Sequence, residues 1–197
     1  MKAVVCTKLG EPNLLEIKDI DKPTINKDEV LIKVEVAGVN FPDALLVQGK
    51  YQIVIDPPFI PGNEVCGIIE EKGENVDIPV GTKVIGIPPI GGFAEFVTIN
   101  KNLVIPVSMN FDSLAGASLP INYGTSYYAL KRRANAQSGE SLLVLGASGG
   151  IGTATIQLAK VMGLKTICAV GSDNKEQYAK SLGGDEIVRY DQVDLKE

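Results

Sequence analysis

Histidine is absent from the 197 residues of this chain, and only three cysteines are present. Histidine is the commonest general acid–base in enzymes and the commonest zinc ligand, so its absence argues against both roles and predicts no metal site. The cysteines, Cys6, Cys66 and Cys168, are odd in number, widely spaced and set among apolar neighbours. This pattern predicts buried free thiols in a reducing compartment rather than a disulfide framework or a metal cluster.

Blocks of like charge and long hydrophobic runs are also missing. The net charge is -5, and without a basic cluster neither nucleic acid nor an acidic membrane surface is an expected partner. No apolar run approaches the ~20 residues of a membrane helix. The first residues, Met1-Lys2-Ala3-Val4-Val5, lack the apolar stretch and cleavage site of a signal peptide, so we expect a cytoplasmic protein.

Short apolar segments separated by proline and glycine turns dominate the first half of the chain. From Val30 to Val36, valine and isoleucine alternate with Leu31, Lys33 and Glu35, which predicts a half-buried strand. Similar strands are predicted at 3–7, 14–20, 65–70, 83–87, 93–99 and 103–107. Many short strands without intervening helices predict an antiparallel barrel or sandwich.

The pattern changes near Phe111. Asp112 is expected to cap a short helix, and a longer helix is predicted from Tyr123 to Ala134. Beyond it, predicted strands at 141–145, 165–170 and 186–190 alternate with predicted helices at 151–162 and 173–182. Strands that alternate with helices indicate a parallel sheet. We therefore expect two domains, a strand-rich one over 1–118 and an α/β one over 119–197.

A glycine-rich segment follows the first strand of the α/β part, with the sequence Gly146-Ala147-Ser148-Gly149-Gly150-Ile151-Gly152. Glycines at this place let backbone amides approach a pyrophosphate, and the next helix offers unpaired N–H groups at its N-terminus. Ser148 stands where the second glycine of the dinucleotide motif is expected, so the match is imperfect. A tight turn that binds nothing is the alternative, but the strand–turn–helix context favours dinucleotide binding.

The choice between NAD and NADP is expected at the end of the second strand of this part. NAD enzymes place an acidic residue there to bind the ribose 2′-OH. Here Gly171 leaves room, Ser172 offers a hydrogen bond and Lys175 brings positive charge, which suits a 2′-phosphate and predicts NADPH. Asp173 argues for NAD, but its spacing to Glu176 predicts a capping box at the start of the helix instead.

Several motifs occur in an order that resembles the medium-chain dehydrogenase/reductase superfamily, in its zinc-free quinone oxidoreductase (zeta-crystallin-like) branch. The resemblance runs essentially the whole length of the chain. It is carried by Gly38-Val39-Asn40-Phe41-Pro42-Asp43, Pro61-Gly62-Asn63-Glu64, Gly91-Gly92-Phe93-Ala94-Glu95-Phe96, Gly139-Glu140, the glycine loop, Gln157-Leu158-Ala159-Lys160 and Leu182-Gly183. The resemblance implies a GroES-like antiparallel barrel that carries the substrate site, followed by a Rossmann domain.

The resemblance also implies which residues meet the cofactor and whether a metal is present. Zinc members of the superfamily carry cysteine where Asn40 stands and histidine where Asn63 stands, so no catalytic zinc is expected. Their cysteine-rich lobe is absent, since little separates Ile87 from Gly91, so no structural zinc is expected either. Thr125 is expected near the nicotinamide. The remaining expected NADPH contacts are Ala147, Ser148, Gly149, Gly150 and Ile151 at the pyrophosphate and Gly171, Ser172, Lys175 and Tyr190 around the adenosine ribose phosphate.

The implied reaction is transfer of a hydride from the nicotinamide to a quinone or a similar conjugated carbonyl. Negative charge then develops on a carbonyl oxygen, and without zinc or histidine its stabilisation falls to hydroxyl, amide or backbone donors. Asn40 and Tyr51 are the candidate catalytic residues, although Asn40 is also explained as a turn residue and Tyr51 as a packing residue. No proton donor is assigned, since solvent can serve.

A complete domain of this kind needs about six parallel strands, and the sequence supplies three. We therefore expect a C-terminally truncated chain with an incomplete Rossmann domain and an exposed sheet edge. Three functions stay open: an NADPH-dependent quinone reductase, an enoyl reductase of the same superfamily, and a non-catalytic remnant that binds nucleotide or a partner. The expected partners are a small quinone or enone and either a second copy in a homodimer or a missing C-terminal segment.

Overall fold

The computed structural model describes residues 1–193, and the chain divides into two compact units, Met1–Ser118 and Leu119–Glu197. All three cysteines are buried and free, as predicted. Among the described residues, no helix combines the length and the apolar character needed to cross a bilayer.

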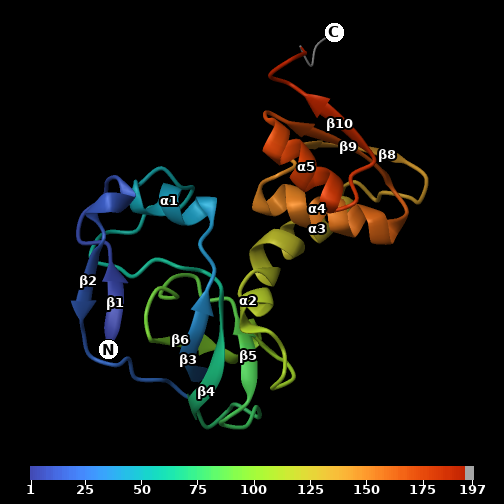
Figure 1. Cartoon of the computed structure of the whole chain (residues 1–197). Helices are drawn as coiled ribbons and strands as arrows, with labels where there is room; N and C mark the ends of the chain where they lie inside the picture. The colour runs from blue at the N-terminus through green and yellow to red at the C-terminus, as the bar shows by residue number, and fades with distance from the viewer. Residues whose placement is uncertain (194–197) are drawn as a thin grey trace. The chain divides into compact units, whose positions relative to one another are not determined.

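The first unit is built on an antiparallel sheet with the strand order β6-β3-β4-β5-β7 (Figure 1). Its strands are β3 (Glu29–Ala37), β4 (Val65–Lys72), β5 (Lys83–Gly86), β6 (Phe96–Asn100) and β7 (Val104–Pro106). A second antiparallel pair, β1 (Lys2–Val5) with β2 (Glu16–Asp19), is joined to the rest by the bridges Ala3–Ala94 and Cys6–Phe59. Every strand predicted for this part of the chain is therefore confirmed, within a few residues at its ends.

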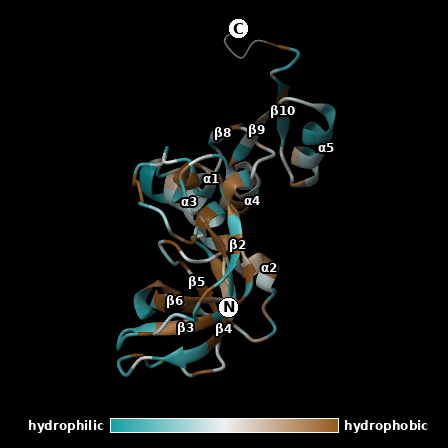
Figure 2. Ribbon diagram, turned by 90° about the vertical axis from the view of Figure 1, so that its left-hand side faces the viewer, coloured by the Kyte–Doolittle hydropathy of each residue, from teal (hydrophilic) through white to brown (hydrophobic). Residues whose placement is uncertain are grey.

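Side chains from the strands of the large sheet form most of the core of the first unit, and much of this sheet is coloured as hydrophobic in Figure 2. It contains nine buried side chains: Val30, Ile32, Val65, Ile69, Val76, Val84, Val97, Ile99 and Val104. Leu31 alternates with these buried residues along β3, yet its side chain is also 0% exposed. The pairing of β3 with β4 shifts register between Leu31 and Ile32, and such an irregularity breaks strict alternation.

This unit contains two α-helices, one between its strands and one after them, and only the second was predicted. Helix α2 (Ser113–Gly116) is capped by Asp112, whose carboxylate accepts a hydrogen bond from the amide of Leu114 at 3.1 Å, as expected. Helix α1 (Phe41–Val47) contradicts the expectation of strands without intervening helices. Its signals were an acceptor side chain three residues after Asn40 and a proline in the first turn. Short 3₁₀ turns occupy Pro12–Leu14 and Lys101–Leu103.

The second unit contains a parallel sheet of three strands in the order β10-β9-β8. Its elements are β8 (Ser141–Leu145), α4 (Gly150–Met162), β9 (Lys165–Val170), α5 (Asp173–Ser181) and β10 (Glu186–Arg189). One face of the sheet packs on both helices, through a cluster that joins Val144, Cys168 and Val170 to Ile156 of α4 and Ala179 of α5 (Figure 1). The alternation of strands and helices confirms the predicted parallel sheet.

A further helical run precedes this sheet and packs on α4. It comprises a π-helical turn η3 (Leu119–Tyr123), helix α3 (Gly124–Tyr127) and a second π-helical segment η4 (Tyr128–Arg133). The run therefore begins four residues before the predicted start at Tyr123. Inside it, the buried Ser126 donates to the carbonyl of Ile151 at 3.2 Å and accepts from the hydroxyl of Thr155 at 3.0 Å. These bonds tie the run to the first turns of α4.

Strand β8 lies at one edge of the three-stranded sheet. Its side chains alternate, so that Leu142 and Val144 pack towards the helices, whereas Leu143 and Leu145 point to the other face. Leu143 is 54% exposed and Leu145 is 66% exposed. The expected exposed sheet edge, with an apolar face beside it, is therefore present in the described part of the chain.

Candidate functional site

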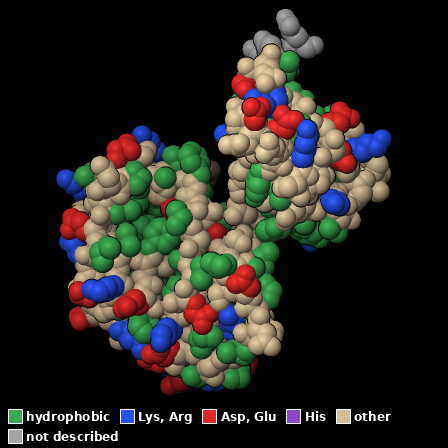
Figure 3. All heavy atoms as spheres, in the orientation of Figure 1, with side chains coloured by type: hydrophobic (Ala, Val, Ile, Leu, Met, Phe, Trp, Pro, Cys, Tyr) green, Lys and Arg blue, Asp and Glu red, His purple; other side chains and the backbone are tan. Residues whose placement is uncertain are grey.

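An apolar pocket of about 220 Å³ lies in the first unit, beside α1. It is lined by Pro42, Asp43, Leu46, Tyr51, Ile53, Ile55, Asn63, Pro89 and Ile90. Figure 3 shows hydrophobic side chains gathered on the face of this unit over α1. An apolar hollow with a few polar groups is the usual form of a small-molecule site.

Tyr51 and Asn63 supply polar atoms to this pocket. The structure places Tyr51, a predicted catalytic residue, in the pocket wall, next to Ile53 and Ile55. Asn63 was singled out only as the residue that stands in a zinc-ligand position. Its Oδ1 atom is buried and accepts no hydrogen bond from any residue in the described part of the chain. A buried acceptor without a partner is costly, so this oxygen is suited to a donor that a ligand brings.

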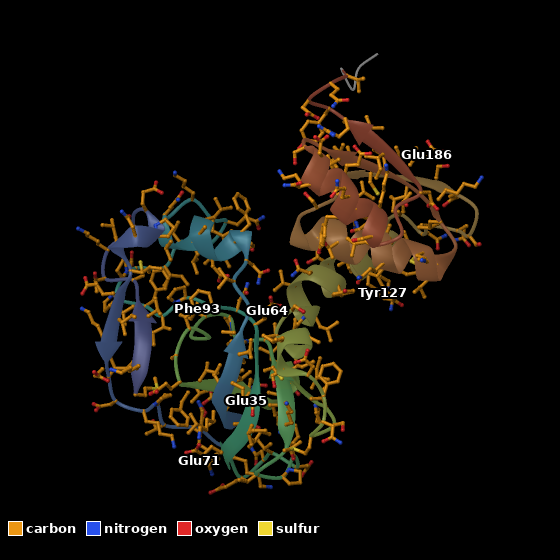
Figure 4. The ribbon with its side chains drawn as sticks, in the orientation of Figure 1. Glu35, Glu64, Glu71, Phe93, Tyr127 and Glu186 are labelled. Carbon is orange, nitrogen blue, oxygen red and sulfur yellow. The ribbon has the colours of Figure 1, made fainter. Side chains whose placement is uncertain are left out.

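Asn40, the other predicted catalytic residue, is not among the residues that line this pocket. Its side-chain amide donates to Oε1 of Glu64 at 2.6 Å, and Glu64 is 1% exposed. Figure 4 labels Glu64 in the first unit. Space around this pair is tight, since a Cβ atom on Gly38 would lie 2.2 Å from Oε1 of Glu64. The structure therefore brings Asn40 and Glu64 together, whereas Tyr51 is the predicted catalytic residue that lines the pocket.

Asp43 contacts both the pocket and Asn40, and it was not predicted as a functional residue. Its carboxylate lines the pocket, is 4% exposed and accepts a hydrogen bond from the backbone amide of Asn40 at 2.8 Å. Burial raises the pKa of Asp43 above its usual value, while hydrogen bonds from the backbone amides of Asn40 and Gly62 act in the opposite direction. The signal for this residue was its place three residues after a helix N-cap.

The raised pKa of Asp43 gives a pH-dependent prediction. Because the folded pKa lies above the unfolded value of about 3.9, ionisation of Asp43 disfavours the fold as pH rises through the folded pKa. Asp43→Asn removes this cost. The free energy of unfolding of the variant minus that of the wild type should therefore be larger, in the stabilising direction, at pH 7 than at pH 4. Urea unfolding of both proteins at the two pH values tests this. A difference that does not change with pH would contradict it.

The glycine loop joins β8 to α4 in the second unit. Gly146 has a φ of 62°, which favours glycine, and its carbonyl accepts a hydrogen bond from the amide of Gly149 at 2.9 Å. The amide of Thr153 donates to the carbonyl of Gly149 at 2.8 Å, as the first intrahelical bond of α4. The amides of Gly150, Ile151 and Gly152 precede that bond and have no carbonyl one turn earlier in the helix.

Close packing leaves little room for a side chain at two glycines of this turn. A Cβ atom on Gly152 would lie 2.5 Å from the carbonyl oxygen of Gly146, and one on Gly150 would lie 2.5 Å from Oδ1 of Asn122. A hollow of about 380 Å³ opens beside the turn, between the loop, β8 and Thr155 of α4. Amides beside a hollow at a helix N-terminus are suited to a phosphate group, so Gly150 and Ile151, among the predicted pyrophosphate residues, fit the dinucleotide.

Other predicted cofactor residues occupy different places around these elements. Ala147 is buried, and its amide donates to the carbonyl of Ala169 at 3.2 Å, so this residue anchors the loop. Ser148 is partly exposed between the loop glycines. Thr125 is exposed on α3, whereas its neighbour Ser126, which was not predicted, makes the contact with α4.

The residues predicted around the adenosine ribose lie where β9 ends and α5 begins. Gly171 ends this strand region, and a Cβ atom there would lie 2.5 Å from Cε2 of the Tyr190 ring. Ser172 is the N-cap residue of α5, but its hydroxyl does not cap the helix in the described part of the chain. Lys175 is exposed on the first turn of α5. Gly171, Ser172 and Tyr190 are thus brought together, with Lys175 one turn away.

The predicted capping box of Asp173 with Glu176 is wrong. The N-cap is Ser172, so Asp173 is the first helical residue and cannot fill the capping position. Both carboxylates instead bind the guanidinium of Arg189 on β10. Hydrogen bonds to Asp191 and Asp173 raise the pKa of Arg189, which therefore stays charged. The cap explanation for Asp173 no longer applies.

Residues 1–193 contain no group of three or more histidine, cysteine, aspartate or glutamate side chains arranged to hold a metal ion.

Two family matches divide the chain in the same order as the two units. Residues 26–109 match the alcohol dehydrogenase GroES-like domain, and residues 150–197 match the family described as zinc-binding dehydrogenase. The quinone oxidoreductase-like protein 2 of Bos taurus is 38% identical over 200 residues, which cover 100% of this chain and 56% of that protein.

Solved structures show the same relationship. The quinone oxidoreductase of Thermus thermophilus, also solved in complex with NADPH, is 37% identical with a TM-score of 0.86, over 98% of this chain and 61% of that one. The Escherichia coli quinone oxidoreductase complexed with NADPH is 25% identical with a TM-score of 0.94, over 99% of this chain and 60% of that one.

A GroES-like antiparallel domain followed by a parallel, Rossmann-like sheet defines the class of medium-chain dehydrogenases/reductases, which confirms the predicted fold class. Within that superfamily the chain is similar to quinone oxidoreductases, and it spans a little over half the length of the relatives it matches.

Proposed function

We propose that this chain binds NADPH and supports transfer of a hydride to a quinone or a similar conjugated carbonyl compound without zinc. The observation that carries the proposal is the turn between β8 and α4. Its amides at Gly150, Ile151 and Gly152 have no partner one helical turn earlier, and Gly152 has no room for a side chain. The NADPH complexes of the Thermus and Escherichia coli quinone oxidoreductases support the choice of cofactor.

The roles of individual residues follow from their positions. The amides of Gly150, Ile151 and Gly152 would hold the pyrophosphate, together with Ser148 and Gly149 on the loop. Ser172, Lys175 and Tyr190 would surround the ribose 2′-phosphate above Gly171, and Thr125 would lie near the nicotinamide. The bound cofactor supplies the hydride. The protein's contribution is to fix the dinucleotide and to leave its reactive end accessible to a second, apolar ligand.

The apolar pocket of the first unit is the proposed substrate site. Its aliphatic walls suit a planar carbonyl compound, and the hydroxyl of Tyr51 can donate a hydrogen bond to a carbonyl oxygen that gains negative charge. Asn40 is proposed to act indirectly, through its bond to Glu64. Amide side chains at Asn40 and Asn63 lack the thiolate and imidazole that zinc requires, which supports a reaction without metal.

Turnover of a quinone tests this proposal. Wild-type protein should oxidise NADPH in the presence of a benzoquinone, and Tyr51→Phe and Asn40→Ala should each lower kcat by roughly 10–100-fold, because a donor to the developing charge is lost or misplaced. Initial rates of NADPH oxidation measure this effect. Tyr127→Phe, an exposed tyrosine outside the pocket, is the matched control and should leave the rate unchanged.

The acceptor and the binding data distinguish the alternatives. Faster turnover of an unsaturated ketone than of any quinone would replace the quinone reductase by an enoyl reductase. NADPH binding without turnover of either acceptor would indicate a nucleotide-binding remnant, and unchanged rates in both pocket variants would remove Tyr51 and Asn40 from the mechanism. A cytoplasmic location and a homodimer, or completion by a further segment, stay predictions.

A further inference from the structure

Arg189 at the end of β10 is surrounded by carboxylates. Its Nη1 atom binds Asp173 and also Oε2 of Glu176 at 3.2 Å. Its Nε and Nη2 atoms bind the two carboxylate oxygens of Asp191 at 2.8 and 2.7 Å. The arginine side chain is 12% exposed, so this fork is fixed by its partners rather than spread into solvent. Figure 3 shows acidic and basic side chains side by side at this end of the second unit.

The partner that matters most is Asp173. It follows Ser172 directly, at the point where β9 passes into α5 and where the Tyr190 ring covers Gly171. An acidic side chain at the end of the second strand of a dinucleotide fold binds the ribose 2′-OH of NAD and repels the 2′-phosphate of NADP. The carboxylate of Asp173 is 83% exposed, so it is free to turn to a ligand unless another group holds it.

We propose that Arg189 determines the cofactor preference of this site by holding the carboxylates of Asp173 and Glu176 on the α5 side. This inference rests on the proposed dinucleotide function. Lys180 also binds Glu176, at 2.6 Å, so both acidic residues of the first turns of α5 are engaged by cations. Ser172 and Lys175 then remain to receive a 2′-phosphate without an opposing free carboxylate.

This arrangement predicts opposite shifts in cofactor preference for two substitutions. Arg189→Met would release Asp173 and Glu176, whose charges oppose a phosphate and whose oxygens accept a hydrogen bond from a ribose hydroxyl. Asp173→Asn would remove one carboxylate and release one guanidinium N–H towards the ligand. The first variant should therefore shift preference towards the unphosphorylated ribose, and the second should shift it towards the phosphorylated one.

Adenosine 2′,5′-bisphosphate and adenosine 5′-monophosphate are the probes, because they engage the adenosine half of the site alone. Calorimetric titration of the 197-residue protein gives a Kd for each, and the ratio of the two reports the preference. Arg189→Met should reduce the preference for the bisphosphate about tenfold, and Asp173→Asn should increase it severalfold. Arg132→Met, an exposed change of the same charge at a helix end, should leave the ratio as it is in the wild type.

The ratio separates this role from a structural one, because a distorted site loses affinity for both probes equally. Equal losses for both probes in Arg189→Met, or an unchanged ratio in Asp173→Asn, overturn the inference and leave the dinucleotide proposal intact. Failure of the wild type to bind either probe overturns both. If Arg189→Met does not fold, the Asp173→Asn ratio decides the question.

Discussion

Gly152→Ala is expected to weaken NADPH binding by about 100-fold, because the added Cβ atom would lie 2.5 Å from the carbonyl oxygen of Gly146 and the loop has to move. A backbone oxygen cannot rotate away as a side chain can. The displacement would move the amides that precede the first bond of α4, and these are the proposed pyrophosphate donors. We also expect a loss of about 1–3 kcal/mol in the free energy of unfolding from overpacking.

Gly124→Ala is the matched control for this variant. Gly124 lies in helix α3 of the same unit, is exposed, and has no atom within 4 Å of an added Cβ. Alanine there should stabilise the helix by roughly 0.5–1 kcal/mol and leave NADPH affinity unchanged. Fluorescence titration of NADPH and thermal unfolding of both variants provide the measurements. Wild-type affinity in Gly152→Ala would remove the loop from the proposed site.

Ile32→Ala is expected to have the largest effect on stability, with a loss of about 2–5 kcal/mol in the free energy of unfolding of the first unit. Ile32 is 0% exposed on β3, and its side chain packs in the cluster that joins β3 to β4, β5 and β6. The truncation leaves a cavity. The surrounding strands cannot move in to fill it without breaking their hydrogen-bonded register. Because Asn40 follows β3 and Glu64 precedes β4, weaker pairing of these strands should also loosen the bond between them.

Ile17→Ala makes the same chemical change on β2, where the side chain is 74% exposed, and should alter stability by less than about 0.5 kcal/mol. Urea unfolding of both variants, with hydrogen exchange at the β3 and β4 amides, assigns the loss to the first unit. Equal effects of the two substitutions would show that the large sheet does not carry the core of this unit.

Much of the secondary structure could be predicted because it depends on local patterns. Alternation along β3 and helical spacing along α4 repeat within a few residues, and hydrogen bonds within an element follow the same period. Helix α1 was missed because its seven residues are too short to show a helical period. The burial of side chains on both sides of the β3 alternation, including Leu31, was not predicted, because a register shift in the pairing with β4 is not visible in one strand alone.

The candidate site was predicted only in part, because local patterns reveal consecutive residues but not contacts between distant ones. The glycine loop was identified because its residues are consecutive. Asn40 and Glu64 are 24 positions apart in the sequence, and no local pattern indicated their hydrogen bond. The capping box was predicted from spacing at one helix, whereas the partner that Asp173 uses is Arg189, on a strand 16 positions away.

By itself, the sequence determined the order of the strands, the helices α4 and α5, and the absence of histidine chemistry, since each depends on residue types and short-range spacing. Its ordered motifs also carried the resemblance to the superfamily. The tertiary structure decided which side chains meet: the unpartnered oxygen of Asn63 beside Tyr51, and the carboxylates around Arg189. The physical reason is that contacts between distant segments depend on strand register and helix packing. Those are set by the whole core and not by any one segment.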